Sequence, residues 1–170
     1  GPRGKEGGGG NMTEALTLDQ AKAVLEAFGP VAQLRWNRIQ VVTEPGKARD
    51  VIKAAFGSLS CDRVIQMSTA DVGENFELTY HLTGPHRTVI SIRVHIPREN
   101  PSIASVHDLL PPAGIYERQI HDLFGIVFRG HPNLARIILN EDWPLKEYPM
   151  RKDWKPVKGT FYGGIQEEVR

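Results

Sequence analysis

The side chains best suited to chemistry in this chain are six histidines and one cysteine. Both residue types bind transition metals and serve in nucleophilic catalysis, so their spacing is the first test for an active site. His81 and His95 fall on two predicted strands, and His107 and His121 lie around a predicted helix. Because these spacings match no His-x-x-x-His or related motif, we predict no metal site in this chain.

The single cysteine, Cys61, excludes an intramolecular disulfide, and one thiolate cannot hold an iron–sulfur cluster. A hydrolase in which Cys61 uses a distant histidine, or in which a serine uses His131, is a remote alternative. No nucleophile elbow or comparable local sequence supports it. Nucleotide cofactors are disfavoured because neither a phosphate loop nor a Gly-x-Gly-x-x-Gly segment follows a predicted strand. We predict no catalytic and no cofactor-binding residue.

Charge and hydropathy exclude two further classes of partner. The chain has 21 basic and 20 acidic residues and a formal net charge of +1, so no strong field attracts nucleic acid or anionic lipid. No apolar run approaches the ~20 residues that cross a bilayer, and the start of the chain shows no signal-peptide pattern. We expect a soluble, cytosolic protein with no nucleic-acid partner and no direct membrane span.

Periodic patterns of apolar residues predict the elements that position these side chains. A capping box formed by Thr17 and Gln20 begins a first helix that ends near Gly29. Apolar residues at helical spacing between Pro45 and Gly57 predict a second helix. The other predicted elements are one strand or a tight pair of strands over 34–42, three strands over 62–72, 76–82 and 90–96, and a helix over 116–124 that stops at Gly125.

The last two strands are predicted to form an antiparallel pair with a definite register. Both alternate apolar and polar residues, so their apolar sets must share one face of the sheet. The predicted cross-strand pairs are Phe76 with Val94, Leu78 with Ile92, and Tyr80 with Ile90. This register leaves a loop from Thr83 to Arg87 and places Glu77 opposite Arg93 on the other face.

The order of elements predicts an α+β fold in two layers, with helices packed on one side of a mixed or antiparallel sheet. Residues 12–128 form this domain. Residues 1–11 include four consecutive glycines, and we interpret them as a flexible leader or a cloning remnant. Residues 129–170 are too aromatic for a disordered linker and too often interrupted for a compact subdomain. We interpret them as an extended C-terminal arm that binds a partner.

The most distinctive residues lie on the predicted third helix and in the turn after it. Arg118 and Asp122 stand four residues apart with Glu117 beside them, a spacing that allows side-chain contact. A solvated charged face is the simpler interpretation of such a group. The run from Phe124 to Pro132, however, holds two glycines, two phenylalanines and a proline, which predicts a fixed and unusual backbone path. We expect helix and turn to form a surface for protein docking.

Three runs of residues together resemble the 30-kDa subunit of respiratory complex I, also called its C subunit. They are Glu117 to Ile126, Phe128 to Leu134, and Pro149 to Trp154. The same family includes the matching small subunits of F420H2 dehydrogenases, energy-converting hydrogenases and formate hydrogenlyases. Gln119, His121 and Ala135 depart from the residue types common in the family, and His121 is closer to the hydrogenase-type relatives. The type of parent complex therefore stays open.

The resemblance implies a non-catalytic peripheral-arm subunit of a complex I-type oxidoreductase, supporting electron transfer coupled to ion translocation. It implies docking on the 49-kDa or hydrogenase-large-type subunit and the adjacent iron–sulfur subunit, at the cytoplasmic side of a membrane. It implies no cofactor in this chain, with iron–sulfur clusters and a flavin or NiFe centre on partner subunits. The residues expected to form or support the docking surface are Glu117, Arg118, Asp122, Phe124, Gly125, Phe128, Gly130, His131, Pro132, Arg136, Arg151 and Lys152. A free-standing binding module is the remaining alternative.

Overall fold

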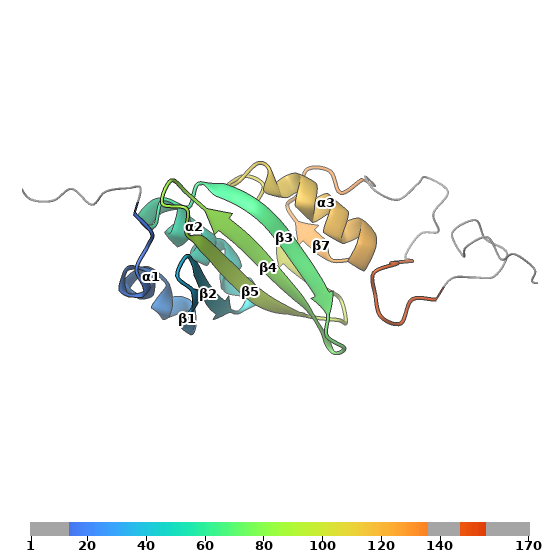
Figure 1. The fold of residues 1–170 in the computed structure, drawn as a ribbon. Coiled ribbons are helices and arrows are strands. Elements are labelled where there is room, and N and C mark those ends of the chain that lie inside the picture. Colours follow the sequence, from blue (N-terminus) through green and yellow to red (C-terminus); the bar gives the residue numbers. More distant parts are fainter. Residues whose placement is uncertain (1–13, 136–146, 156–170) are drawn as a thin grey trace, which may run out of the picture.

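A computed structural model describes residues 14–135 and 147–155 of the chain (Figure 1). The α-helices are α1 (Leu18–Leu25), α2 (Ala48–Ser58) and α3 (Ala113–Phe124). A 3₁₀ turn at Glu26–Phe28 follows α1, and another at Pro45–Lys47 precedes α2. The strands are β1 (Val31–Arg35), β2 (Arg38–Thr43), β3 (Arg63–Asp71), β4 (Asn75–Thr83), β5 (Val89–Pro97), β6 (Ser102–Ala104) and β7 (Val127–Arg129).

Local sequence signals account for the ends of the helices. At the start of α1, the Gln20 N–H donates to the Thr17 hydroxyl at 3.1 Å, and the Thr17 N–H donates to Gln20 Oε1 at 2.9 Å. This reciprocal pair confirms the capping box. α3 ends at Gly125, whose φ of 78° is left-handed and whose N–H donates to the His121 carbonyl at 2.9 Å. All three predicted helices are confirmed.

Five strands form one mixed sheet in the order β1-β2-β5-β4-β3. Neighbouring strands are antiparallel except β2 and β5, which run parallel. The region 34–42 contains a tight pair of strands, because Trp36 and Asn37 form a turn between β1 and β2. A two-stranded parallel sheet joins β6 to β7, so the residues after α3 return beside the segment that precedes it.

The register predicted for β4 and β5 is wrong by two residues. The observed pairs are Phe76 with Ile96, Leu78 with Val94, Tyr80 with Ile92 and Leu82 with Ile90, and Glu77 lies opposite His95. Side chains alternate with a period of two, so a shift by two keeps every apolar residue on the core face. The connecting loop decides between the two registers. His86 turns inward and its Nε2 donates to the Leu59 carbonyl at 2.8 Å, which keeps residues 84–88 out of the ladder.

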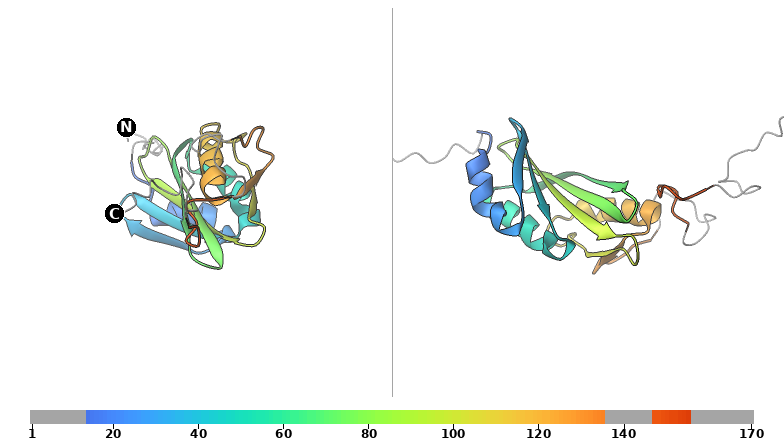
Figure 2. Two further views of the ribbon diagram at one scale, coloured as in Figure 1. Left: turned by 90° about the vertical axis from the view of Figure 1, so that its right-hand side faces the viewer. Right: turned by 90° about the horizontal axis from the view of Figure 1, so that it is seen from below.

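One face of the sheet carries the core and the other is polar. The inward apolar side chains of β4 and β5 are at most 1% exposed, and the three helices cover this face (Figure 2). On the outward face, His81 lies between the hydroxyls of Ser68 and Ser91, at 3.1 and 2.9 Å. The predicted two-layer α+β class is confirmed. Within the described residues, no helix has the length and apolar character needed to cross a membrane.

Candidate docking site around the third helix

The signature residue Glu117 is an interior group of this chain. It has no exposed surface, and its Oε1 accepts hydrogen bonds from the Ser105 hydroxyl and the Val106 N–H, both at 3.0 Å. Burial raises the pKa of Glu117, against the lowering effect of these bonds and of His131 and His107. Its Oε2 has no hydrogen-bond partner among the described residues. Glu117 therefore fixes the backbone after β6 to α3, and a solvated charged face is the wrong interpretation for it.

The two charged residues next to it on α3 are placed differently. Asp122 is 4% exposed, so it also lies inside the chain. Arg118 is half-buried, and its Nε donates to the Ala135 carbonyl at 3.1 Å. The same short segment is stiffened by Asn133, whose side-chain oxygen accepts from the Ala135 N–H at 2.9 Å. Glu117 and Arg118 thus hold the segments before and after α3 against the helix.

The predicted turn after α3 has the fixed path that its glycines and proline indicated. The His121 Nδ1 donates to the Ile126 carbonyl at 2.9 Å, and Phe128 is buried in β7. Gly130 takes a left-handed φ of 83°. His131 then uses both ring nitrogens, since Nε2 donates to the Gly114 carbonyl at 2.9 Å and Nδ1 accepts from the Asn133 N–H at 3.0 Å. This path leads the chain back to the start of α3.

Residues 147–155, called the C-terminal clasp below, bind the other end of α3. The Met150 N–H donates to the Leu123 carbonyl at 3.1 Å, and Arg151 Nε donates to the Phe124 carbonyl at 2.7 Å. These bonds satisfy carbonyls of the last helical turn, which lack partners within a helix. The guanidinium of Arg151 lies 5.1 Å from the ring centre of Phe76 and 4.6 Å from that of Tyr148. Burial lowers the pKa of Arg151.

Gly125 is the residue that permits this contact. Its left-handed φ disfavours side chains, and a Cβ at this position would lie 2.5 Å from the Tyr148 ring. Glycine therefore serves both the end of α3 and the close approach of the clasp.

Asp71, at the end of β3, connects the clasp to the sheet. Its carboxylate accepts from Arg98 Nη1 at 2.7 Å, from the Lys152 N–H at 2.8 Å and from the Gly73 N–H at 3.0 Å. Burial alone would raise the pKa of Asp71, but these three hydrogen bonds outweigh it and lower the pKa to about 2. The other amino group of Arg98 pairs with Asp153 of the clasp at 2.5 Å. The carboxylate thus holds the clasp through its backbone.

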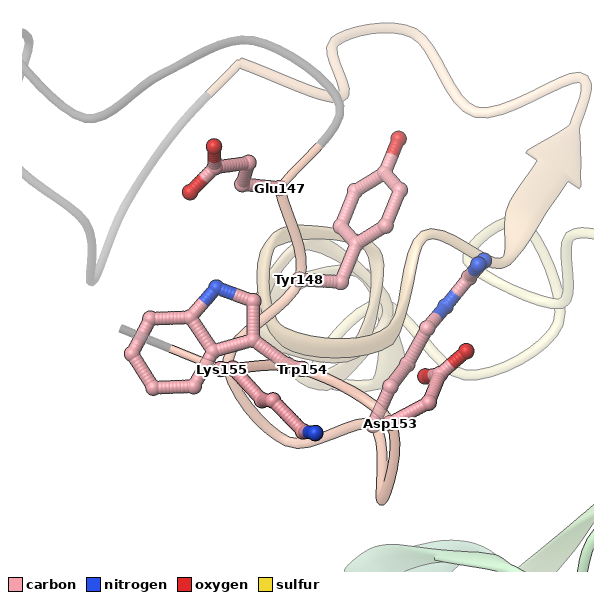
Figure 3. A pocket seen from close by; sticks show the side chains of 6 residues that line it. Glu147, Tyr148, Asp153, Trp154 and Lys155 are labelled. Atoms are coloured by element: carbon pink, nitrogen blue, oxygen red, sulfur yellow. The ribbon is translucent and has the colours of Figure 1, made fainter. Parts of the chain in front are cut away.

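The clasp lines an open pocket of about 280 Å³, and the side chains around it carry both charges (Figure 3). In Figure 3, Glu147 and Trp154 lie on one side of the segment and Asp153 on the other. Two acidic and two basic side chains share the lining, which consists of Glu147, Tyr148, Arg151, Asp153, Trp154 and Lys155. Such a balanced lining indicates no particular small-molecule ligand.

A second hollow, beside the start of α3, has a mainly apolar surface. This groove measures about 280 Å³, and its lining residues are His107, Pro111, Gly114, Ile115, Arg118, His131, Pro132 and Asn133. Ile115, one of these lining residues, is 53% exposed. A concave apolar surface with few polar groups at its edge suits insertion of an apolar side chain. We call it the α3 groove.

Cys61 and His86 lack the geometry of a nucleophile and its base. The sulfur of Cys61 lies 3.7 Å from Nε2 of His86, which stands 25 residues later in the sequence. That nitrogen donates to the Leu59 carbonyl, and the His86 Nδ1 accepts from the Thr88 N–H at 3.0 Å. Both ring nitrogens of His86 are thus engaged in hydrogen bonds, and burial raises the pKa of Cys61 to about 12. A protonated thiol is a poor nucleophile.

Most of the predicted site residues gather around α3. His131, Pro132 and Arg118 line the α3 groove, whereas Arg151 and Lys152 belong to the clasp. Arg136 lies outside the described residues. Sequence patterns did not indicate the buried contacts that support this arrangement, which involve chiefly Asp71, Arg98, Ser105 and Tyr148. No pattern in residues 62–72 marked Asp71.

Comparisons with known proteins agree on one family. The model of the family described as respiratory-chain NADH dehydrogenase, 30 Kd subunit, matches residues 41–160. The C subunit of the F(420)H(2) dehydrogenase of Methanosarcina mazei is 35% identical over 149 residues, covering 85% of this chain and 90% of that protein. The C subunit of the NADH-quinone oxidoreductase of Chelativorans sp. is 33% identical over 168 residues, covering 94% of this chain and 82% of that protein.

Two solved structures share the fold. A chain in the structure of the membrane-bound sulfane sulfur reductase, an archaeal respiratory membrane complex, gives a TM-score of 0.62 at 26% identity. That match covers 81% of this chain and 84% of the other. The trypsin-resistant fragment (1-134) of Nqo5 gives a TM-score of 0.56 at 26% identity, covering 68% of this chain and 95% of the fragment.

Proposed function

The chain belongs to the family of the 30 Kd subunit of respiratory-chain NADH dehydrogenase, and we propose that it docks on the large, hydrogenase-like subunit of its parent complex through the α3 groove. It is a peripheral-arm subunit of a complex I-type oxidoreductase. We assign it no catalytic step, and we expect the iron–sulfur clusters and the flavin or NiFe centre on neighbouring subunits, at the cytoplasmic side of the membrane.

The α3 groove is the observation that carries this proposal. One of its lining residues, Ile115, is half exposed, whereas Glu117 and Asp122 on the same helix are buried. Interfaces commonly insert an apolar side chain into a preformed pocket with a polar rim. Here the polar lining residues are His107, Arg118, His131 and Asn133. Because hydrogen bonds of Glu117, Arg118 and His131 fix the surrounding backbone, the groove keeps its shape before binding, which favours affinity.

The clasp refines what the C-terminal arm is proposed to do. Arg151 and the backbone of Lys152 bind this chain's own α3 and Asp71. We therefore propose that these two residues support the docking face by ordering the clasp. Exposed groups of the clasp, such as Met150 at 54% exposure, extend the surface available to the partner.

The parent complex is proposed to be a complex I or F420H2 dehydrogenase type, with a hydrogenase or formate hydrogenlyase as the alternative. The long match to a subunit of the F(420)H(2) dehydrogenase supports the first type. His121, the residue that suggested hydrogenase-type relatives, has a structural role here because it donates a hydrogen bond to the Ile126 carbonyl. Its presence is thus explained without reference to the electron donor.

Ile115→Asp tests the docking face. Ile115 is the third residue of α3, where a carboxylate is favourable to the helix, so the fold should survive. A charge in the apolar groove would have to be desolvated on docking. We expect at least a tenfold loss of this chain from the purified, membrane-derived complex, measured by quantitative mass spectrometry of the subunits.

Phe56→Asp is the matched control, since Phe56 is 48% exposed on α2. It introduces the same charge at a similar exposure away from the α3 groove and from the clasp. Equal recovery of Ile115→Asp and Phe56→Asp in the complex would refute docking through the α3 groove.

A further inference from the structure

A second exposed surface lies at the turn between β1 and β2, far from the α3 groove. Trp36 is 74% exposed there, and Leu34 beside it is 51% exposed. β1 is one edge of the sheet and β3, against which α3 packs, is the other. Four strand spacings of about 4.8 Å separate these edges by roughly 19 Å. Figure 1 shows the β1–β2 pair and α3 on opposite sides of the molecule.

The turn is held firmly although its side chains are exposed. Gln33 Nε2 donates to the Trp36 carbonyl at 3.3 Å, and the Val89 N–H donates to the Asn37 carbonyl at 2.8 Å. The second bond fastens the turn to the start of β5, a central strand. The indole is therefore presented on a rigid support, and binding through it would cost little ordering entropy.

The charge of this surface selects the kind of partner. Arg35 and Arg38 flank the turn and both are exposed. No acidic residue occurs between Pro30 and Thr43, so the two guanidinium groups have no neutralising neighbour within this stretch of sequence. Tryptophan and arginine are among the residue types most enriched in the dominant contacts of protein interfaces. An isolated exposed apolar residue is ordinary, but this turn combines two of them with two cations.

We propose that this turn, the Trp36 surface, binds an acidic face of a second neighbouring subunit, so that the chain bridges two partners from opposite edges of its sheet. Trp36 fills a shallow apolar depression on that partner, and Arg35 and Arg38 pair with carboxylates around it. This inference rests on the chain being part of a multi-subunit complex, but it does not depend on the α3 groove.

The test is site-specific photo-crosslinking in the intact complex purified from membranes. Benzoylphenylalanine is placed at position 36, with position 56 as the control, because Phe56 is 48% exposed on α2. We expect position 36 to crosslink to one other subunit, at a segment rich in aspartate or glutamate, with at least ten times the yield of position 56. Adding Arg35→Glu and Arg38→Glu should lower the yield at least tenfold.

Three results would overturn the proposal: a yield at position 36 no higher than at position 56, adducts only with lipid, or adducts only with a second copy of this chain. Position 115 carries the probe in a parallel sample. An intact complex with crosslinks at position 115 and none at 36 refutes the Trp36 surface alone. Crosslinks at 36 and none at 115 refute docking through the α3 groove and leave the Trp36 surface standing.

Discussion

Asp71→Asn is the sharpest test of how the C-terminal clasp is held. The substitution keeps the shape of the side chain and removes the charge that receives Arg98 and the Lys152 N–H. The folded pKa of about 2 lies below the ordinary aspartate value of 3.8. At about 1.4 kcal/mol per pKa unit, this difference corresponds to about 2.5 kcal/mol of folding free energy. Because the side chain is 1% exposed, solvent screening should remove little of it.

The sign of the pH dependence follows from the lowered pKa. A carboxylate whose pKa is depressed by folding contributes stability above its unfolded pKa, near 4, and loses that contribution as the pH falls toward 2. Asp71→Asn should therefore be about 2 kcal/mol less stable than the unsubstituted chain at pH 7. The difference should shrink between pH 4 and pH 2.

Urea unfolding of both chains at several values between pH 7 and pH 2.5 measures this difference, and trypsin cleavage after Arg151 reports on the clasp. Asp108→Asn is the control. The pKa of Asp108 is also lowered to about 2, by Arg49, but its side chain is 51% exposed. Such an exposed pair should contribute at most about 1 kcal/mol. Equal losses for both variants, or unchanged cleavage after Arg151 in Asp71→Asn, would refute the reasoning.

Two further substitutions test α3 itself. Gly125→Ala should lower the free energy of unfolding by more than about 1 kcal/mol, because the left-handed conformation disfavours alanine and the new Cβ would lie 2.5 Å from the Tyr148 ring. Gly57→Ala, with no atom within 4 Å of the added Cβ, should stabilise α2 slightly. Thermal unfolding of the two variants compares these effects directly. Glu117→Gln keeps an acceptor for Ser105 and Val106 and removes a carboxyl whose pKa folding raises. Stability of the unsubstituted chain should fall as the pH rises above the unfolded value of 4.5. Glu117→Gln should therefore gain stability relative to it as the pH rises from that value, and an unchanged difference would contradict the assignment.

The three helices and the strands of the five-stranded sheet were predictable because local sequence specifies each of them, whereas the short strands β6 and β7 were not predicted. Thr17 and Gln20 suffice for the first capping box, and Gly125 for the end of α3. The register of β4 and β5 was not predictable, since two registers that differ by two residues bury the same apolar side chains. The inward turn of His86 onto Leu59 decides between them, and it joins residues 27 positions apart.

The candidate site shows the same division between local and distant information. The three charged signature residues were recognised on one helix, but their partners come from elsewhere in the chain. Glu117 accepts a hydrogen bond from Ser105. In the clasp, Lys152 donates its N–H to Asp71, which stands 81 residues earlier in the sequence. Sequence periodicity carries no information on such pairs, and nothing in the pattern of residues 62–72 marked Asp71 as a buried charge that needs a partner.

The burial of the signature has a consequence for locating interfaces in this family. Glu117, Asp122, Phe124 and Phe128 are each at most 5% exposed, so a partner cannot contact them without opening the domain. These buried signature residues therefore form a framework that supports the proposed docking face. Direct contact must come from the exposed residues that this framework positions, such as Ile115 at the α3 groove and Met150 in the clasp. Substitutions in the framework should lower stability and assembly together, while substitutions at Ile115 should separate the two.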